Sequence, residues 1–273
     1  MSSTTDLAGY TAVVTGASSG IGRAIAEQLA AHGVYVVISG RDETALDAVV
    51  SAIQAGGGAA VGIPVDLRDP LTVNLLVDAA ITNTGRLDIF VNNAGVSYLG
   101  TILDADIEQW RNMLETNVLA LLAGSKAAVT AMRAGGRPGH LVNISSVAAL
   151  DPNSGVYGAT KHAVNVITNT LRQELVDDPI KVTSIMPGLV ATNIGRNVDP
   201  ALLAGLVAMS GIDVEIVPGE RLPDEVLAGA QAALSEIMMS PEDIAAAVLF
   251  AVTQPKGVDV TEIVVRPNKP ANL

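Results

Sequence analysis

The sequence predicts an α/β fold in which a parallel sheet is covered by helices on both faces. Short apolar runs rich in Val and Ile, with few charges, have the composition of buried strands. Longer amphipathic segments separate these runs, and the alternation continues from end to end of the chain. Strand-helix alternation of this kind is typical of a parallel sheet with crossover helices.

The expected elements follow in order along the chain. Strands are expected at residues 11–15, 35–39, 60–65, 88–92, 140–145 and 181–186, and a last one within 259–267. Helical patterns occupy residues 21–33, 42–57, 70–85, 114–129, 166–178 and 240–255. Gly33, Gly56 and Gly85 stand where helix C-caps fall, while Ser240 and Pro241 open the last helix.

Residues 193–240 depart from this rhythm, because they hold two short apolar helical patterns. The first carries Leu202, Leu203, Leu206 and Val207, and the second carries Val226, Leu227, Ala230, Leu234 and Ile237. A long excursion after the carboxyl end of a strand predicts a lid over a site. An ordinary packed pair of surface helices explains the pattern equally well.

Composition limits the classes of function. The 273 residues suffice for one large α/β domain, and without a linker or a break in composition we interpret residues 1–273 as a single domain. The net charge of −12 argues against nucleic acid and anionic membrane as partners. Cysteine is absent from the sequence, which excludes disulfides, thiolate catalysis and cysteine-ligated zinc.

Location and metal binding follow from similar observations. The first ten residues lack the features of a secretory signal, and the longest apolar run, 117–129, is interrupted by Ser125 and Lys126. We therefore expect a cytoplasmic protein. His32, His140 and His162 do not cluster in the sequence, so no metal site is predicted.

A glycine-rich loop follows the first strand. Gly16, Gly20 and Gly22 stand between that strand and the opening of the first helix. Glycines there permit a tight turn and a close approach of backbone N–H groups to a pyrophosphate. A glycine triplet alone is weak evidence, since turns need glycine anyway, but the strand-loop-helix setting strengthens it.

The end of the second strand bears on which dinucleotide binds. An acidic residue there would bind the ribose hydroxyls of NAD, whereas this chain has Gly40 and Arg41. A small residue leaves room for a 2′-phosphate, and the guanidinium can pair with it. We interpret Asp42 as a helix N-cap. NADP(H) is the favoured cofactor, with NAD(H) as the alternative.

Tyr157 and Lys161 stand four residues apart in an expected helix, so their side chains share one face. An exposed pair of surface residues and a catalytic pair both fit this spacing. A free tyrosine has a pKa of about 10. A neighbouring ammonium would lower that pKa and allow the phenol to exchange its proton near neutral pH.

Five motifs together resemble the short-chain dehydrogenase/reductase family in its one-domain form. They are "TGASSGIG" at 15–22, "NNAG" at 92–95, Asn117, "NISS" at 143–146, and Tyr157 with Lys161. The resemblance extends from about residue 8 to residue 267. It implies a Rossmann-type doubly wound sheet of about seven parallel strands that binds a nicotinamide cofactor at their carboxyl ends.

The resemblance also implies roles for individual residues. Tyr157 is the general acid or base, helped by Lys161 and by the positive charge of the oxidised nicotinamide, and Lys161 also holds the nicotinamide ribose. Ser146, or less favourably Ser145, binds the substrate carbonyl, although only eleven residues separate Ser146 from Tyr157, fewer than is usual in the family. Asn117 binds a water that relays protons from Lys161.

Cofactor contacts are implied in the same way. Asp66 with Leu67 meets the adenine, and the loop from Pro187 to Thr192 binds the nicotinamide carboxamide. The full expected set is Gly16, Ser18, Ser19, Gly20, Ile21, Gly22, Arg41, Asp66, Leu67, Asn93, Ala94, Gly95, Tyr157, Lys161, Pro187, Gly188, Val190 and Thr192.

The function expected from this resemblance is an NADP(H)-dependent oxidoreductase that interconverts a ketone or aldehyde with an alcohol. Tyr98, Leu99, Leu150 and Ile194 suggest a lipophilic or uncharged substrate. The last strand resembles a subgroup of carbonyl reductases, hydroxy-acid dehydrogenases and clavaldehyde dehydrogenase-like enzymes. The alternatives are an NAD-linked alcohol or hydroxysteroid-type dehydrogenase working oxidatively and a non-catalytic dinucleotide sensor. A homo-oligomer, a dimer or tetramer, is expected because the helix at 117–132 is apolar on more than one face.

Overall fold

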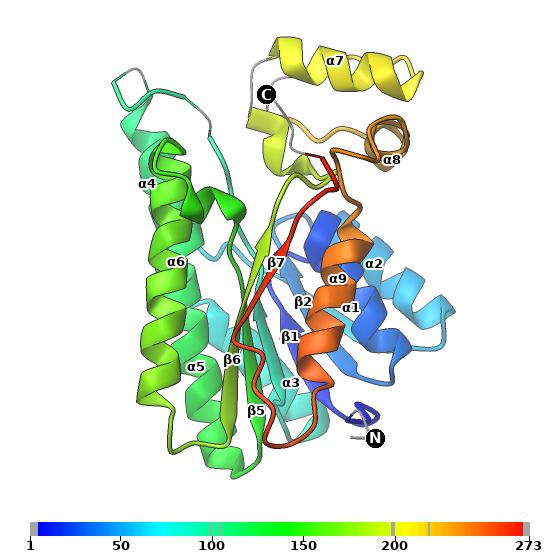
Figure 1. The fold of residues 1–273 in the computed structure, drawn as a ribbon. Coiled ribbons are helices and arrows are strands. Elements are labelled where there is room, and N and C mark those ends of the chain that lie inside the picture. Colours follow the sequence, from blue (N-terminus) through cyan, green and yellow to red (C-terminus); the bar gives the residue numbers. More distant parts are fainter. Residues whose placement is uncertain (1–4, 99, 104, 198–199, 218, 270–273) are drawn as a thin grey trace.

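A central parallel sheet between two layers of helices forms the body of the protein (Figure 1). The computed structural model describes residues 5–98, 100–103, 105–197, 200–217 and 219–269. Seven strands pair in the order β3-β2-β1-β4-β5-β6-β7, and every pairing is parallel. The predicted α/β fold of Rossmann type is confirmed.

The strands match the expected positions closely. They are β1 (Thr11–Val14), β2 (Tyr35–Gly40), β3 (Ala59–Pro64), β4 (Ile89–Asn92), β5 (Gly139–Ile144), β6 (Ile180–Pro187) and β7 (Glu262–Val265). Apolar side chains point to both faces: Val36 and Ile38 enter one core, and Val37 enters the other. A strand buried on both faces must be apolar throughout, and for this reason the apolar runs in the sequence predicted the strands well.

Helices cover the two faces in separate groups (Figure 1). On one face lie α1 (Gly20–Ala31), α2 (Glu43–Ala55) and α9 (Pro241–Val252). On the other lie α3 (Val73–Thr84), α5 (Ala120–Gly135) and α6 (Gly155–Glu174). The helix α4 (Ile107–Leu114) continues through a π-helical turn (Glu115–Leu119) into α5.

Most expected helix ends are found, but the start of the third helix differs from the expectation. The Asp42 carboxylate accepts the Ala45 N–H (3.0 Å), as expected of an N-cap. The third helix, however, begins at Val73 rather than near Asp69, whose carboxylate instead accepts the Leu71 N–H (3.0 Å) in a preceding turn. Side-chain bonding by Asp within its own turn competes with helix formation there.

Residues 193–240 extend beyond the carboxyl ends of the strands (Figure 1). They form a short 3-10 turn (Asn193–Asn197) and the helices α7 (Pro200–Ser210) and α8 (Asp224–Ala233). Leu203, Val207, Leu222 and Val226 form a small core between these helices. The second pattern was expected to reach Ile237, but the helix ends at Ala233. The side chain of Leu202 lies outside the described part of the chain.

One helical stretch, Ile107–Gly135, has the length and apolar composition of a membrane span. Such a stretch is weak evidence, because core helices of soluble proteins pass the same test. Here Ala128, Val129 and Met132 of α5 are buried in the core that α5 shares with α3 and the sheet. The stretch therefore serves as a layer of the fold.

A buried histidine makes the fold sensitive to acid. His140 on β5 is only 6% exposed, and its Nε2 lies 2.7 Å from the Thr183 hydroxyl oxygen on β6. The Thr183 hydroxyl itself donates to the Val260 carbonyl (2.6 Å), so Nε2 carries the hydrogen and donates. Burial, and then the charge of Lys181, lower the pKa of His140 to about 3.

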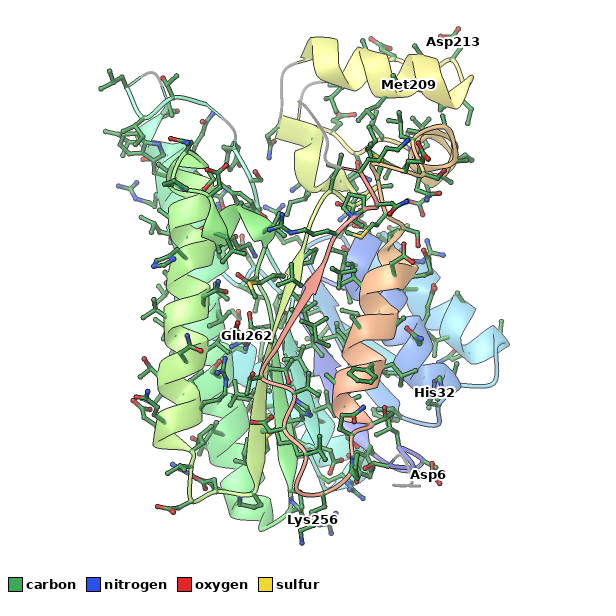
Figure 2. All side chains as sticks on the ribbon, in the orientation of Figure 1. Asp6, His32, Met209, Asp213, Lys256 and Glu262 are labelled. Carbon is green, nitrogen blue, oxygen red and sulfur yellow. The ribbon has the colours of Figure 1, made fainter. Side chains whose placement is uncertain are left out.

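We expect the free energy of unfolding to fall as the pH drops from about 6.5, the ordinary histidine value, toward 3. In that window the unfolded chain binds a proton at His140 and the folded chain does not. Between pH 7 and 5 the wild type should lose about 2 kcal/mol more than His140→Gln, by urea unfolding. His32→Gln, at an exposed site near the end of α1 (Figure 2), is the control. Equal acid dependence in wild type and His140→Gln would contradict this account.

Candidate active site

The expected site residues come together at one edge of the sheet, where β1, β4, β5 and β6 end. Carboxyl ends of parallel strands share an edge, so loops far apart in sequence meet there. The glycine loop follows β1, Asn93 to Gly95 follow β4, and Ser145 with Ser146 follows β5. The N-terminal part of α6 brings Tyr157 and Lys161 to the same edge.

The glycine loop needs its glycines for two different reasons. Gly16 and Gly20 have backbone φ angles of 64° and 55°, which residues other than glycine rarely adopt. Gly22 has no room, because a Cβ there would lie 2.4 Å from Asn93 Nδ2 and 2.5 Å from the Gly16 carbonyl oxygen. The loop therefore lies tightly against the end of β4.

The N-terminus of α1 is arranged to receive an anion. Within the described part of the chain, the Ser19 side chain makes no capping hydrogen bond, and the first turn of the helix carries no carboxylate. The first N–H groups of a helix have no partner within the helix, and the helix dipole is positive there. A cradle of this kind fits the pyrophosphate of a dinucleotide.

Thr15 and Asn93 hold the loop in place, and sequence reasoning missed Thr15. The Thr15 hydroxyl accepts the N–H groups of Asn93 (2.9 Å) and Ala94 (3.0 Å). The Asn93 amide donates to the carbonyls of Thr15 (2.8 Å) and Gly16 (3.1 Å). These bonds fix the end of β4 to the glycine loop. A Thr immediately before the first glycine was the available signal.

A second network, of amide and hydroxyl side chains, lies between the sheet and the helices α5 and α6. The Asn92 amide donates to Asn143 Oδ1 (2.9 Å) and to the Ser125 hydroxyl (3.1 Å), and the Asn143 amide donates to the Thr168 hydroxyl (2.9 Å). All four groups are buried. The network joins β4 and β5 to α5 and α6, so it fixes the helix that carries Tyr157 and Lys161.

At the end of β2, Gly40 lets Ser18 of the glycine loop approach the strand closely. A Cβ at Gly40 would lie 2.9 Å from the Ser18 hydroxyl oxygen. Arg41 acts electrostatically on Asp66, whose carboxylate binds the Arg68 guanidinium (Nε to Oδ2, 2.9 Å). That hydrogen bond is the main cause of the lowered pKa of Asp66. Leu67, the next residue, is buried.

Lys161 is a buried cation, only 3% exposed. Its Nζ donates to the Ile144 carbonyl at the end of β5 (2.9 Å) and lies 5.9 Å from the centre of the Tyr157 ring. Burial lowers the pKa of Lys161 to about 8. The ammonium form therefore still predominates at neutral pH.

The pKa of Tyr157 differs from the expectation. Neighbouring positive charge was expected to lower it, but burial raises it, and the hydrogen bond with the Ser146 hydroxyl offsets this only in part. Lys161 directs its ammonium at the Ile144 carbonyl. The protein's own groups thus do not lower the pKa of Tyr157 below its ordinary value of about 10.

The two serines after β5 have different partners. The Ser145 hydroxyl is buried and donates to the Lys161 carbonyl (3.2 Å). Ser146 forms the hydrogen bond with Tyr157, and its oxygen also accepts the Ala148 N–H (3.1 Å). The short connection between Ser146 and Tyr157 folds as a compact 3-10 turn (Val147–Leu150). Ser146, favoured over Ser145 from the sequence, is thus the serine that pairs with Tyr157.

Asn117 lies in the π-helical turn between α4 and α5, so the expected irregularity of the helix is present. Its amide donates to the Val96 carbonyl (3.0 Å) and the Thr160 hydroxyl (3.0 Å), and its oxygen accepts the Val96 N–H (2.8 Å). Both amide hydrogens are therefore satisfied by protein groups. A Cβ on Gly95 would lie 3.4 Å from Asn117 Oδ1 and 3.5 Å from Lys161 Nζ.

The loop after β6 closes the remaining side. Pro187 ends β6, and the Gly188 N–H donates to the Val265 carbonyl (2.8 Å). Thr192 lies against the glycine loop, because a Cβ on Gly20 would be 3.1 Å from Thr192 Cγ2. Val190 forms a bridge with Met239. This loop therefore connects the glycine loop to the segment that follows α8.

The residues expected to meet the substrate are only partly placed at the site. The Tyr98 hydroxyl accepts the Asn112 amide of α4 (2.8 Å). Leu150 and Ile194 are 53% and 37% exposed. Leu99 lies outside the described residues.

A seven-stranded parallel sheet with a glycine-rich loop at its carboxyl edge defines a dinucleotide-binding oxidoreductase fold. A family model described as short chain dehydrogenase matches residues 10–202. An uncharacterized oxidoreductase of Staphylococcus haemolyticus is 36% identical over 265 residues, covering 96% of this chain and 99% of that protein. The chain belongs to the short-chain dehydrogenase/reductase family.

Two solved structures are similar over almost their whole length. A metagenomic short-chain oxidoreductase in complex with NADP has a TM-score of 0.73 and 30% identity, covering 96% of this chain and 99% of that one. A short-chain dehydrogenase/reductase from Burkholderia phymatum in complex with NAD has a TM-score of 0.76 and 28% identity, covering 95% and 90%. The protein is an oxidoreductase that uses a nicotinamide dinucleotide.

Proposed function

We propose that the protein is an NADP(H)-dependent enzyme that interconverts a ketone or aldehyde with an alcohol. The observation that carries the proposal is the grouping of Tyr157, Ser146 and Lys161 at the sheet edge that also holds the glycine loop. A phenol, a hydroxyl and a buried ammonium are the groups that proton transfer to an alkoxide requires.

Each group has a separate task. The Tyr157 hydroxyl gives its proton to the developing alkoxide, or takes it from the alcohol. Ser146, already hydrogen-bonded to Tyr157, orients the substrate oxygen beside it. Bound nicotinamide supplies or accepts the hydride, and its oxidised form adds the positive charge that lowers the pKa of the phenol.

Lys161 and Asn117 support this proton transfer. The Lys161 ammonium adds positive charge near the phenol and binds the nicotinamide ribose hydroxyls. Asn117 is fixed by Val96 and Thr160, and its oxygen retains a lone pair for a water that connects Lys161 to solvent. The proton leaving Tyr157 is replaced along this path.

The cofactor residues fit a dinucleotide in its expected order. The loop of Gly16, Ser18, Ser19, Gly20, Ile21 and Gly22 holds the pyrophosphate, and Asp66 with Leu67 borders the adenine. Asn93, Ala94 and Gly95 line the site between the adenosine and the nicotinamide ribose of the cofactor. Pro187, Gly188, Val190 and Thr192 hold the nicotinamide carboxamide. The close contacts of Gly16 with Ala94 and of Gly20 with Thr192 support this arrangement.

A lipophilic or uncharged small molecule is the proposed substrate, since the exposed apolar side chains of Leu150 and Ile194 lie on loops that follow β5 and β6. Residues 193–240 act as a lid on a single catalytic domain. The proposed compartment is the cytoplasm, and with a net charge of −12 we propose no nucleic-acid or membrane partner.

Replacing Tyr157 with Phe should lower kcat by about 100-fold or more, because the proton donor is lost. Turnover is followed by nicotinamide absorbance on a panel of ketones and alcohols with both cofactors. Tyr35→Phe is the control and should keep wild-type rates, because Tyr35 lies at the amino-terminal end of β2, away from the carboxyl ends that form the site. Retained turnover in Tyr157→Phe would rule out the phenol as the acid.

Replacing Arg41 with Asp should move the preference from NADPH toward NADH by about tenfold or more, since a guanidinium for the 2′-phosphate is exchanged for a ribose-binding carboxylate. The ratio of kcat/KM for the two cofactors measures it. The NAD-bound relative keeps the NAD-linked dehydrogenase as a second candidate. An unchanged ratio would reject the role of Arg41, whereas a wild type that prefers NADH would favour that second candidate.

We also propose a homo-oligomer, a dimer or tetramer. Leu114, Leu119 and Leu122, on the helix that runs from α4 into α5, are 43–52% exposed, as is Val166 of α6. Light scattering at assay concentration should give two or four times the chain mass of 27.9 kDa. A mass equal to one chain would refute association.

A further inference from the structure

An arginine from the lid reaches the glycine loop. Arg221 lies between α7 and α8, and its Nη2 donates to the Ser18 hydroxyl (2.9 Å). Its Nη1 lies 3.7 Å from Asp42 Oδ2, at the N-cap of α2. Ser18 also packs against Gly40 at the end of β2, where a Cβ would lie 2.9 Å from its hydroxyl oxygen. A guanidinium from the segment that covers the strand ends thus lies at the adenosine end of the dinucleotide site.

The chain that follows Arg221 is fixed. Buried Asn193 donates to the Leu222 carbonyl (3.0 Å) and accepts the Leu222 N–H (2.8 Å). Two residues further on, Asp224 forms an ion pair with Arg23 of α1 (2.8 Å). The Asn193 amide pairs with Leu222 as a neighbouring strand would, so the position of Arg221 is built into the fold.

Positive charge is concentrated around this point. Arg196 is affected by both Arg41 and Arg221, and its pKa is lowered first by burial and then by these two charges. Arg41 and Arg221 therefore both lie within electrostatic reach of Arg196, and Arg221 contacts Ser18. The Asp42 carboxylate, which pairs with Arg221, also accepts the Ala45 N–H. Like charges gathered in this way favour a dianion, such as a phosphate monoester.

We propose that Arg221 is a second arginine for the adenosine 2′-phosphate of NADP(H), contributed by the lid and acting with Arg41. This inference rests on the proposed preference for NADP(H). When the phosphate binds, Arg221 exchanges the Ser18 hydroxyl for a charged acceptor. The cofactor that carries the phosphate thereby holds the lid to the glycine loop, and NAD(H) has no group to do so.

Dissociation constants of NADPH and NADH, from titrations of nicotinamide fluorescence, test the proposal without turnover. Arg221→Ala should weaken NADPH about tenfold or more and leave NADH within about twofold. Calorimetry with 2′,5′-ADP, which has the phosphate but no nicotinamide, should show the same loss. Asp224→Asn, which breaks the tie to Arg23 but keeps Arg221, should change NADPH binding by no more than about threefold.

Four results would overturn the proposal. They are an equal loss for NADH, unchanged binding of NADPH in Arg221→Ala, a loss in Asp224→Asn as large as that in Arg221→Ala, and recovery of NADPH affinity in the double variant Arg221→Ala/Asp42→Asn. The last result would mean that Arg221 only neutralises Asp42. If the wild type itself binds NADH as tightly as NADPH, the proposed cofactor preference fails instead, and the two failures are distinguishable.

Discussion

The site depends on one buried charge, the ammonium of Lys161. Taking an ammonium out of water is costly, and its lowered pKa of about 8 records that cost. The bond to the Ile144 carbonyl keeps the group in place while it stays charged at neutral pH. Gly95, just after β4, lies beside it, and Tyr157 is the next side chain on its own helix face. Three separate elements therefore meet at a single cation.

The rest of the fold serves to bring those elements together. Parallel pairing places the ends of β1, β4, β5 and β6 at one edge, and Thr15 and Asn93 join two of those ends by hydrogen bonds. Below them the Asn92–Asn143 network ties the sheet to α5 and α6. Buried polar groups that are fully bonded in this way are rigid. The helices α7 and α8 lie beyond a site that the sheet has already positioned.

The sequence predicted the sheet well, because strands buried on both faces are apolar throughout. It also predicted that Tyr157 and Lys161 share one helix face, as they do in the structure. Contacts between segments that are distant in the sequence could not be predicted. Arg221 and Ser18 are 203 positions apart, and no periodicity connects them. The start of α3 was missed because Asp69 could cap a helix or close a turn. The pKa of Tyr157 went the other way because burial of the hydroxyl depends on how the whole edge packs.

The central claim is that Tyr157 releases its proton readily only when the positive charge of the oxidised cofactor is added to that of Lys161. Phenolate absorbance near 295 nm, taken as wild type minus Tyr157→Phe, measures the pKa of this one tyrosine. We predict a midpoint above the ordinary tyrosine value for the protein alone and a clearly lower midpoint with saturating NADP⁺. The same midpoint with and without NADP⁺ would contradict the account.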